Sequence, residues 1–273
     1  MTEPTLRILS LGAGVQSSVM ALMSAKGELP RVDCAIFADT QWEPKGVYEH
    51  LDWLESVVSN PLCVDQPFPV YQVTAGNIRD DHIKSIKEGT NIRGMMPLFA
   101  DGGFGRRQCT NAYKIEPIKR KIRDILHLKK GQRVPKGVNV VQWLGISTDE
   151  SARMKPSGDK WITNTWPLID QGMSRQHCIS WFDKNYPGRV LSKSACIACP
   201  FHNDAMWRDM KINDPISFDD AVDFDAKIRV SQSGKIQYVH RSLGPLGEVD
   251  FRNLEDKGQL NMFNNECEGM CGV

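Results

Sequence analysis

The sequence predicts an α/β protein with a Rossmann-like parallel sheet, helices on both faces of the sheet, and a small C-terminal region that contains cysteines. The main observation is that short apolar runs, typical of buried strands, alternate with stretches of helical periodicity. The expected strands cover residues 6–11, 32–38, 70–73 and 138–146, and the expected helices cover residues 17–25, 44–58, 77–87 and 113–126. This alternation favours a parallel sheet, because each parallel strand needs a crossover connection.

Local signals support the individual elements. Gly12 follows the first strand, and Gly27 is suited to end the first helix. Pro44 is suited to start the second helix, whose apolar residues recur at helical spacing, and Pro117 stands near the start of the fourth. Residues 89–107 are rich in glycine, arginine and asparagine, which predicts a loop.

The pattern changes after about residue 170, which predicts a domain over residues 1–170 and a smaller region over residues 171–273. In the second region we expect helices at residues 174–185, 204–211 and 216–230 and a cysteine-bearing loop at residues 187–200. Ligands of parallel sheets bind at the carboxyl ends of the strands. The loops at residues 12–18, 39–43 and 147–153 follow strands and are therefore expected to gather at one edge of the sheet.

Composition argues against several classes of function. The 273 residues carry a net charge of +1, so no overall electrostatic attraction to nucleic acid or membrane is expected. No apolar run approaches the ~20 residues that span a bilayer, and the N-terminal residues lack the apolar core of a signal peptide. We therefore expect a cytoplasmic protein with no membrane partner, in which cysteine pairs indicate metal or redox sites rather than disulfides.

A small-residue loop lies between the first strand and the first helix. Such loops let a phosphate approach backbone amides and a helix N-terminus, and serine hydroxyls add further donors. A tight turn that packs a helix against a strand explains the same residues without a ligand. The candidate phosphate-binding residues are Ser10, Gly12, Ala13, Gly14, Gln16, Ser17 and Ser18.

Three motifs in order resemble the phosphoadenosine-phosphosulfate (PAPS) reductase-like family of the PP-loop superfamily. They are the loop at residues 10–18, the turn Asp39-Thr40-Gln-Trp-Glu-Pro after the second strand, and Cys109 followed by Lys114-Ile-Glu-Pro117-Ile. The resemblance covers residues 6–200 and implies a sulfur-metabolism enzyme that binds an adenine nucleotide, either ATP or a sulfonucleotide (PAPS or adenylyl sulfate). Asp39 and Thr40 would lie near adenine and ribose, and Arg153 would clamp the phosphate or sulfate side, although a surface ion pair with Asp149 or Glu150 explains Arg153 equally well.

One departure from the family bears on the reaction. ATP-splitting members carry an aspartate where this chain has Gln16, and that carboxylate is associated with magnesium-dependent release of pyrophosphate. The resemblance therefore favours the reductases over enzymes that cleave ATP.

The cysteines add a predicted metal centre. By resemblance to iron–sulfur adenylylsulfate reductases, a [4Fe-4S] cluster would be bound by Cys109, Cys196, Cys199 and Cys271, with Cys267 as the nucleophile that attacks the sulfonucleotide. Zinc bound by Cys196, Cys199, Cys267 and Cys271 is the alternative. Cys34, Cys63 and Cys178 stand among apolar residues and are expected to be inert core thiols.

Three functions remain open on the sequence. The first is sulfonucleotide reduction or sulfur transfer, with a thioredoxin-like electron donor. The second is an ATP-dependent sulfurtransferase that modifies nucleic acid, weakly supported by the basic stretch at residues 114–133, although a solvated helix face explains this stretch more simply. The third is an inactive nucleotide-binding module with a structural zinc. A homodimer is the candidate assembly.

Overall fold

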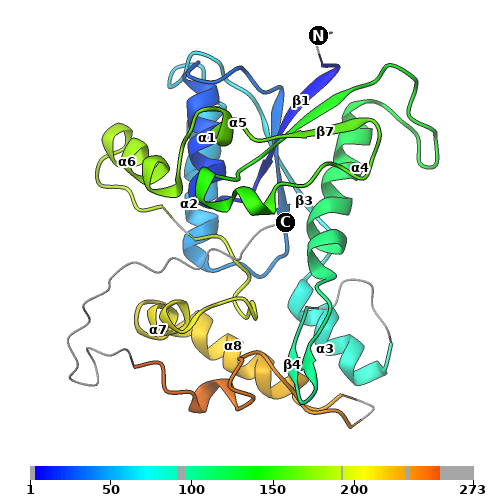
Figure 1. Cartoon of the computed structure of the whole chain (residues 1–273), viewed down its shortest axis with the longest axis vertical. Helices are drawn as coiled ribbons and strands as arrows, with labels where there is room; N and C mark the ends of the chain where they lie inside the picture. Colours follow the sequence, from blue (N-terminus) through cyan, green and yellow to red (C-terminus); the bar gives the residue numbers. More distant parts are fainter. Residues whose placement is uncertain (1–3, 91–95, 192, 232–233, 253–273) are drawn as a thin grey trace.

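A computed structural model describes residues 4–90, 96–191, 193–231 and 234–252 (Figure 1). Its centre is a parallel sheet of five strands in the order β3-β2-β1-β6-β7, which confirms the predicted α/β class with a Rossmann-like sheet. The strands are β1 (Leu6–Leu11), β2 (Cys34–Asp39), β3 (Val70–Thr74), β6 (Val140–Leu144) and β7 (Ile162–Thr165). The chain leaves β1 toward β2 and β3 and later returns to the other side of β1, so the strand order reverses between β1 and β6.

One face of the sheet is covered by helices α1 (Val15–Ala25), α2 (Lys45–Val58), α5 (Pro167–Asp170) and α6 (Arg175–Asn185). Every residue of α1 is buried, because this helix packs against the sheet and against both α2 and α6. The opposite face is covered by α4 (Glu116–Ile125), which places Ile118 and Ile122 against strand residues such as Ile8. The apolar strand sequences follow from this arrangement, since both faces of the sheet are buried.

A second layer lies beyond the carboxyl ends of the strands, at the lower end of the molecule in Figure 1. It contains α3 (Ile78–Glu88), α7 (Asp204–Asn213), α8 (Pro215–Ile228), a 3₁₀ turn (Leu246–Glu248) and a small antiparallel sheet of β4 (Phe99–Ala100), β5 (Gly103–Phe104) and β8 (Gln237–Tyr238). Its core forms around Trp42, Trp207 and Phe224. Segments from both halves of the sequence therefore build this layer.

Several expectations need correction. The predicted helix at residues 113–126 begins earlier, as a π-helical segment (Thr110–Ile115) that leads into α4. The expected loop at residues 147–153 contains a 3₁₀ segment (Thr148–Arg153), and the expected loop at residues 89–107 contains β4 and β5. Strand β7 was not predicted at all, because its sequence Ile-Thr-Asn-Thr carries little apolar signal. Cys63 is exposed, so its assignment as a core thiol was wrong, whereas Cys34 and Cys178 are buried as predicted.

Helix α6 lies beyond residue 170 but packs on α1 in the sheet layer, where Cys178 and Phe182 are fully buried. The expected division near residue 170 therefore separates two elements that share one core. No helix among the described residues is long and apolar enough to cross a membrane.

Truncation of Phe182 tests the packing of α6. We expect Phe182→Ala to lower the free energy of unfolding by about 3–5 kcal/mol, because the ring is fully buried and packs against His50 and Trp53 of α2. Leu62→Ala is the control, since Leu62 is 94% exposed and should change stability by less than about 0.5 kcal/mol. Urea unfolding measures both, and equal stabilities for the two variants would contradict this packing.

Acidification tests the burial of His82 in the second layer. Burial lowers the pKa of His82 from 6.5 to about 4. The folded state thus resists protonation, and the histidine's stabilising contribution is lost as pH falls from 6.5 toward 4. The wild type is expected to lose free energy of unfolding between pH 7 and pH 5 as protonation of this histidine favours the unfolded state. In His82→Gln we expect that loss to be smaller by about 2 kcal/mol. Parallel pH profiles of the two proteins would contradict the burial of a neutral imidazole.

Candidate functional site

A cavity of about 1240 Å³ lies between the carboxyl edge of the sheet and the second layer. The ends of β1 and β6 contribute Ser10, Leu11 and Leu144 to its wall, so the cavity opens where the strand order reverses. Ligands of open α/β sheets bind at such a reversal. The volume exceeds the roughly 300–1000 Å³ of an ordinary small-molecule site, so the cavity can hold more than one small group.

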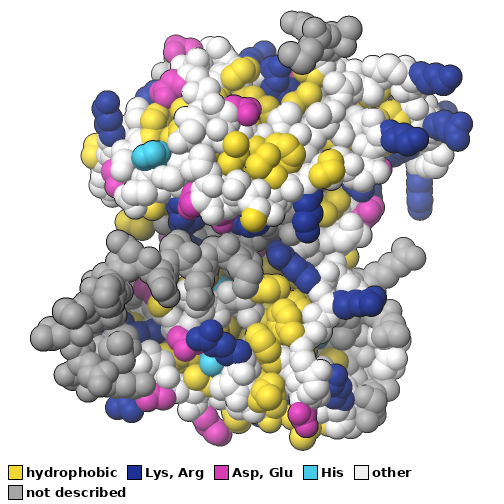
Figure 2. Space-filling view, viewed as in Figure 1, with side chains coloured by type: hydrophobic (Ala, Val, Ile, Leu, Met, Phe, Trp, Pro, Cys, Tyr) yellow, Lys and Arg dark blue, Asp and Glu magenta, His cyan; other side chains and the backbone are white. Residues whose placement is uncertain are grey.

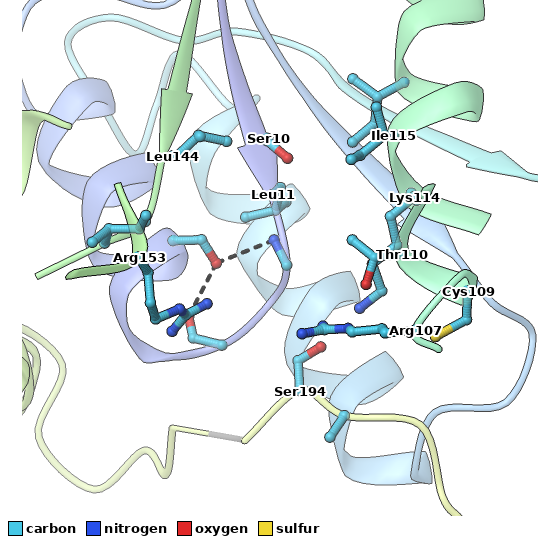
Figure 3. A pocket seen from close by; sticks show the side chains of 18 of the residues that line it. Ser10, Leu11, Arg107, Cys109, Thr110, Lys114, Ile115, Leu144, Arg153 and Ser194 are labelled. Atoms are coloured by element: carbon cyan, nitrogen blue, oxygen red, sulfur yellow. Dashed lines mark hydrogen bonds between the residues drawn. The ribbon is translucent and has the colours of Figure 1, made fainter. Parts of the chain in front are cut away.

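The loop after β1 forms a compact turn against the cavity. The Ser17 hydroxyl accepts a hydrogen bond from the Gly12 N–H at 3.2 Å and donates to the Gly14 carbonyl at 3.3 Å (Figure 3). Ala13 adopts a left-handed backbone conformation with φ 54°, which is uncommon for a residue with a side chain. The turn brings the N-terminus of α1, with its positive partial charge, to the cavity wall.

Gly145, directly after β6, permits close packing of this loop. A Cβ atom at Gly145 would lie 3.0 Å from the Ser17 nitrogen and 3.3 Å from the Gln16 Cβ. A larger residue would therefore push the loop away from the sheet. The position of the loop therefore depends on a glycine that lies far from it in the sequence, directly after β6.

Gln16 connects the loop to two other segments. Its amide nitrogen donates to Glu150 at 3.0 Å and to the Ser147 hydroxyl at 3.3 Å, and its amide oxygen accepts from Arg175 at 3.0 Å. Glu150 also accepts from Arg153 at 2.5 Å. The ion pair between Arg153 and Glu150 that the sequence allowed is therefore present. Arg153 also lines the cavity beside the loop (Figure 3).

Asp149 holds the start of α6 next to this network. Burial acts to raise its pKa, but the backbone N–H of Arg175, which donates to its carboxylate at 2.9 Å, and further hydrogen bonds outweigh burial and lower it. The carboxylate therefore stays ionised at neutral pH, which fixes Arg175 beside Gln16.

Positive charge predominates in the cavity wall. Only two acidic residues, Glu150 and Asp159, line the described part of the cavity, and each pairs with a cation, Arg153 and Lys119 respectively. The remaining basic residues of the wall are Arg107, Lys114, Lys155, Arg175 and Lys193. Such a wall favours a ligand with more than one negative charge.

The predicted basic stretch divides between two places. Lys114 and Lys119 line the cavity, whereas Lys129, Lys130 and Arg133 are exposed in the loop after α4, at the other end of that helix. Figure 2 shows basic side chains at this upper right edge of the molecule. The stretch therefore does not form one continuous surface at the cavity.

A polar cluster at the base of the cavity surrounds the buried Glu43, which does not itself line the cavity but contacts the wall residues Thr40, Lys114, Ser194 and Cys196. The buried carboxylate accepts from Thr40 at 3.5 Å and from Ser194 at 3.4 Å, and the Lys114 ammonium lies 3.9 Å away. Burial raises the pKa of Glu43, and Lys114 opposes that increase. The Cys196 thiol lies 3.3 Å from the Thr40 hydroxyl and 3.9 Å from Glu43.

Three cysteines, Cys109, Cys196 and Cys199, line this end of the cavity. Burial raises the pKa of Cys196 to about 12, and the nearby charges of Glu43 and Cys109 act in the same direction. The thiolate form of Cys196 is therefore suppressed in this environment.

The described residues supply only part of a metal-binding site. Thiols are suitable ligands for iron–sulfur clusters and zinc. Within the described ranges, however, no three histidine, cysteine, aspartate or glutamate side chains are gathered closely enough to hold a metal ion. Cys267 and Cys271, which were expected to complete the site, lie outside the described residues. The cluster and the zinc alternative both remain predictions.

The structure gathers most of the predicted site residues. Those that line the cavity are Ser10, Gly12, Gly14, Gln16, Ser17, Thr40, Cys109, Arg153, Cys196 and Cys199. This confirms that the three strand-end loops meet at one edge of the sheet. Three predicted residues, Ala13, Ser18 and Asp39, do not line it. Ser18 pairs with His50 at 2.9 Å inside the core, and Asp39 accepts from Tyr48 at 2.9 Å.

Sequence reasoning missed Glu43, Arg107, Arg175, Lys193 and Ser194 as site residues. Arg107 reaches toward Ser194 across the cavity from the loop and Arg153 (Figure 3). Lys193 and Ser194 stand three and two residues before Cys196, so the motif of the predicted cysteine pair could have included them. No local signal identifies Arg107 or Arg175, because only the tertiary fold brings them to the cavity.

Neither a scan against protein-family models nor a search of the curated proteins found a match for this chain. The functional argument therefore depends on the residues of the cavity and on the motifs described above.

Substitution of Gly145 tests the packing of the loop. We expect Gly145→Ala to lower the free energy of unfolding by about 1–3 kcal/mol, because the new methyl group crowds the Ser17 backbone. Gly158→Ala is the matched control, since Gly158 also lines the cavity but an added Cβ would meet nothing within 4 Å. Chemical denaturation measures both variants. A Gly145→Ala protein as stable as the control would show that the loop does not depend on this contact.

Proposed function

We propose that this protein is an enzyme of the PAPS reductase-like class that binds an adenylyl sulfonucleotide and reduces it or transfers its sulfur. The observation that carries the proposal is the position of the loop at residues 12–17. It joins β1 to α1 at the reversal of strand order, and it faces a cavity with excess positive charge and three thiols. An anionic nucleotide and a thiol reaction are the chemistry that such a wall supports.

In the proposed complex, the loop and the N-terminus of α1 bind the phosphate of the nucleotide. Arg153 and Arg107 approach from opposite walls and would bind the sulfate side. A guanidinium can donate two parallel hydrogen bonds to such an oxyanion. Thr40, at the end of β2, would lie near the adenosine.

Gln16 supports a sulfonucleotide over ATP as the substrate. Its neutral amide is held by Glu150 and Arg175, and an amide is a weaker ligand for magnesium than a carboxylate. Glu150, the nearest carboxylate, is paired with Arg153. This environment favours binding of an anion by cations and amides rather than through a magnesium ion.

The proposed reaction starts with a cysteine thiolate. The thiolate attacks the sulfur of the sulfonucleotide, a sulfur–sulfur bond forms, and the bond from sulfur to the nucleotide phosphate oxygen breaks. The nucleotide leaves with that electron pair, and the cations of the wall stabilise its charge. An external thiol donor then attacks the sulfur of the modified cysteine and displaces sulfite. The family resemblance suggests that this donor is thioredoxin. The resemblance assigns the attack to Cys267, outside the described residues, while Cys109, Cys196 and Cys199 are the thiols of the cavity.

A metal centre is a further part of this proposal. Cys109, Cys196 and Cys199 would supply three ligands, and a fourth would come from the C-terminal residues. An iron–sulfur cluster supplies electron transfer or electrostatic stabilisation when bound.

Removal of Arg153 tests the proposed binding mode. Arg153→Ala is expected to weaken the binding of adenylyl sulfate or PAPS by about 10–100-fold, because a hydrogen bond to a charged group contributes about 1.5–3 kcal/mol. Titration calorimetry measures the affinity, with AMP and ATP as comparison ligands. Arg133→Ala is the control, since Arg133 is an exposed arginine in the loop after α4.

The proposal would be contradicted in two ways. Wild-type protein that binds ATP only with magnesium, and does not bind sulfonucleotides, would favour the nucleic-acid sulfurtransferase. Equal affinity of the Arg153→Ala and Arg133→Ala variants for sulfonucleotides would remove Arg153 from the site.

A further inference from the structure

Two amide side chains lie side by side in the part of the cavity wall that the sheet provides. Gln142 of β6 and Asn164 of β7 are register partners in neighbouring strands, and both line the cavity. Because side chains alternate between the faces of a strand, these two share a face with Val140 and Ile162, which pack with residues of α4. Gln142 stands two residues before Leu144, the last residue of β6, so it lies roughly 6–7 Å back from the strand end.

Helix α4 leaves this part of the sheet open to the cavity. Among the described helices, α4 packs mainly against β2 and β3, which lie on the other side of β1 from β6 and β7. Strands of a parallel sheet are usually apolar on both faces. The neighbouring amides of Gln142 and Asn164 instead give this face hydrogen-bonding groups.

The two amides have hydrogen-bonding capacity for a ligand. No described residue makes a hydrogen bond with the Gln142 amide. The Asn164 amide nitrogen donates to the Lys155 carbonyl at 3.0 Å, which orients the Asn164 side chain with its oxygen as an acceptor. Gln142 therefore offers both a donor and an acceptor to a ligand in the cavity.

Apolar side chains surround the amide pair. We call this region the inner pocket, and its wall contains Ile115, Ile118, Gln142, Leu144, Ile162 and Asn164. Figure 3 shows Leu144 and Ile115 at the upper end of the cavity, whereas Ser194, two residues before Cys196, lies at the lower end. Apolar walls with a few polar groups are typical of a site for a flat organic ring.

The proposed reaction determines which end of the nucleotide lies in the inner pocket. The sulfate has to reach a thiol, and Cys109, Cys196 and Cys199 line the end of the cavity toward the second layer. The loop at residues 12–17 begins where β1 ends, between the inner pocket and the second layer. With the phosphate on this loop, the base extends into the inner pocket. Thr40 then lies on the ribose side of the adenosine rather than beside the base.

We propose that Gln142 recognises the adenine base of the substrate in the inner pocket. This inference rests on the proposed function for the identity of the ligand and adds the residue that selects its base. The amide oxygen of Gln142 accepts from the N6 amine of adenine, and its nitrogen donates to the neighbouring ring nitrogen. Guanine has an oxygen acceptor in place of this amine, so only one of the two hydrogen bonds can form.

A pair of nucleotides that differ in one group tests this role. Full-length protein is titrated with AMP and with purine riboside 5′-monophosphate, which lacks only the N6 amine. We expect the wild type to bind AMP about 5–100-fold more tightly, because a bidentate amide–adenine pair discriminates by this order of magnitude. Gln142→Ala is expected to bind the two nucleotides with about equal affinity. Gln142→Met, whose apolar side chain has a similar length, should do the same.

The ratio of the two affinities separates recognition from a structural role, because disturbed packing weakens both ligands alike. Gln72→Ala is the matched control, since Gln72 is a glutamine of the same sheet that donates to Glu55 and does not line the cavity. This variant is expected to keep the wild-type ratio. The role of Gln142 is overturned if the wild type binds the two nucleotides equally, if it binds neither, or if the ratio survives in both Gln142 variants.

The proposed function can fail separately, because neither probe contains sulfur. Adenylyl sulfate that is bound but not reduced would contradict the proposed function, whereas a ratio that disappears in the Gln142 variants would still support the assignment of the base. Sulfite formation from adenylyl sulfate with an unchanged ratio in these variants would support the proposed function and overturn the role of Gln142.

Discussion

The candidate site depends on the close packing of the loop after β1 against the end of β6. Gly145 has no side chain, so the Ser17 backbone approaches the sheet to a distance at which a Cβ would be crowded, 3.0 Å from the Ser17 nitrogen. The loop is then held by its own hydrogen bonds and by Gln16, which connects it to Glu150 and Arg175. This contact places the N-terminus of α1 at the cavity and fixes the segment that carries Arg153.

The cavity has two chemically different ends because two layers build it. The sheet layer supplies backbone amides and Arg153, which suit a phosphate or sulfate. The base, where the second layer meets β2, supplies Cys196 and Cys199, which suit sulfur chemistry, and the buried Glu43 lies beside Cys196. A sulfonucleotide carries both kinds of group in one molecule, and this correspondence is why we favour it over ATP.

The sequence predicted those parts of the fold that local patterns determine. Strands buried on both faces are mostly apolar, so β1, β2 and β6 were found, whereas the polar β7 was not. The site motifs were found because a run of glycines and serines between a strand and a helix, and a Cys-x-x-Cys pair, are patterns visible in the local sequence. Arg107 and Arg175 were missed because no local pattern distinguishes them from surface arginines. Cys63 was misassigned because apolar neighbours in the sequence do not ensure burial in space.

The central claim is that a sulfonucleotide lies in this cavity with its anionic end on the loop at residues 12–17. The most direct measurement is a crystal structure of the full-length protein with adenylyl sulfate. The account predicts density for the phosphate at the N-terminus of α1 and for the sulfate between Arg153 and the thiols of Cys196 and Cys199. Density for the nucleotide outside this cavity, or with its adenine on the loop and its sulfate in solvent, would contradict the account.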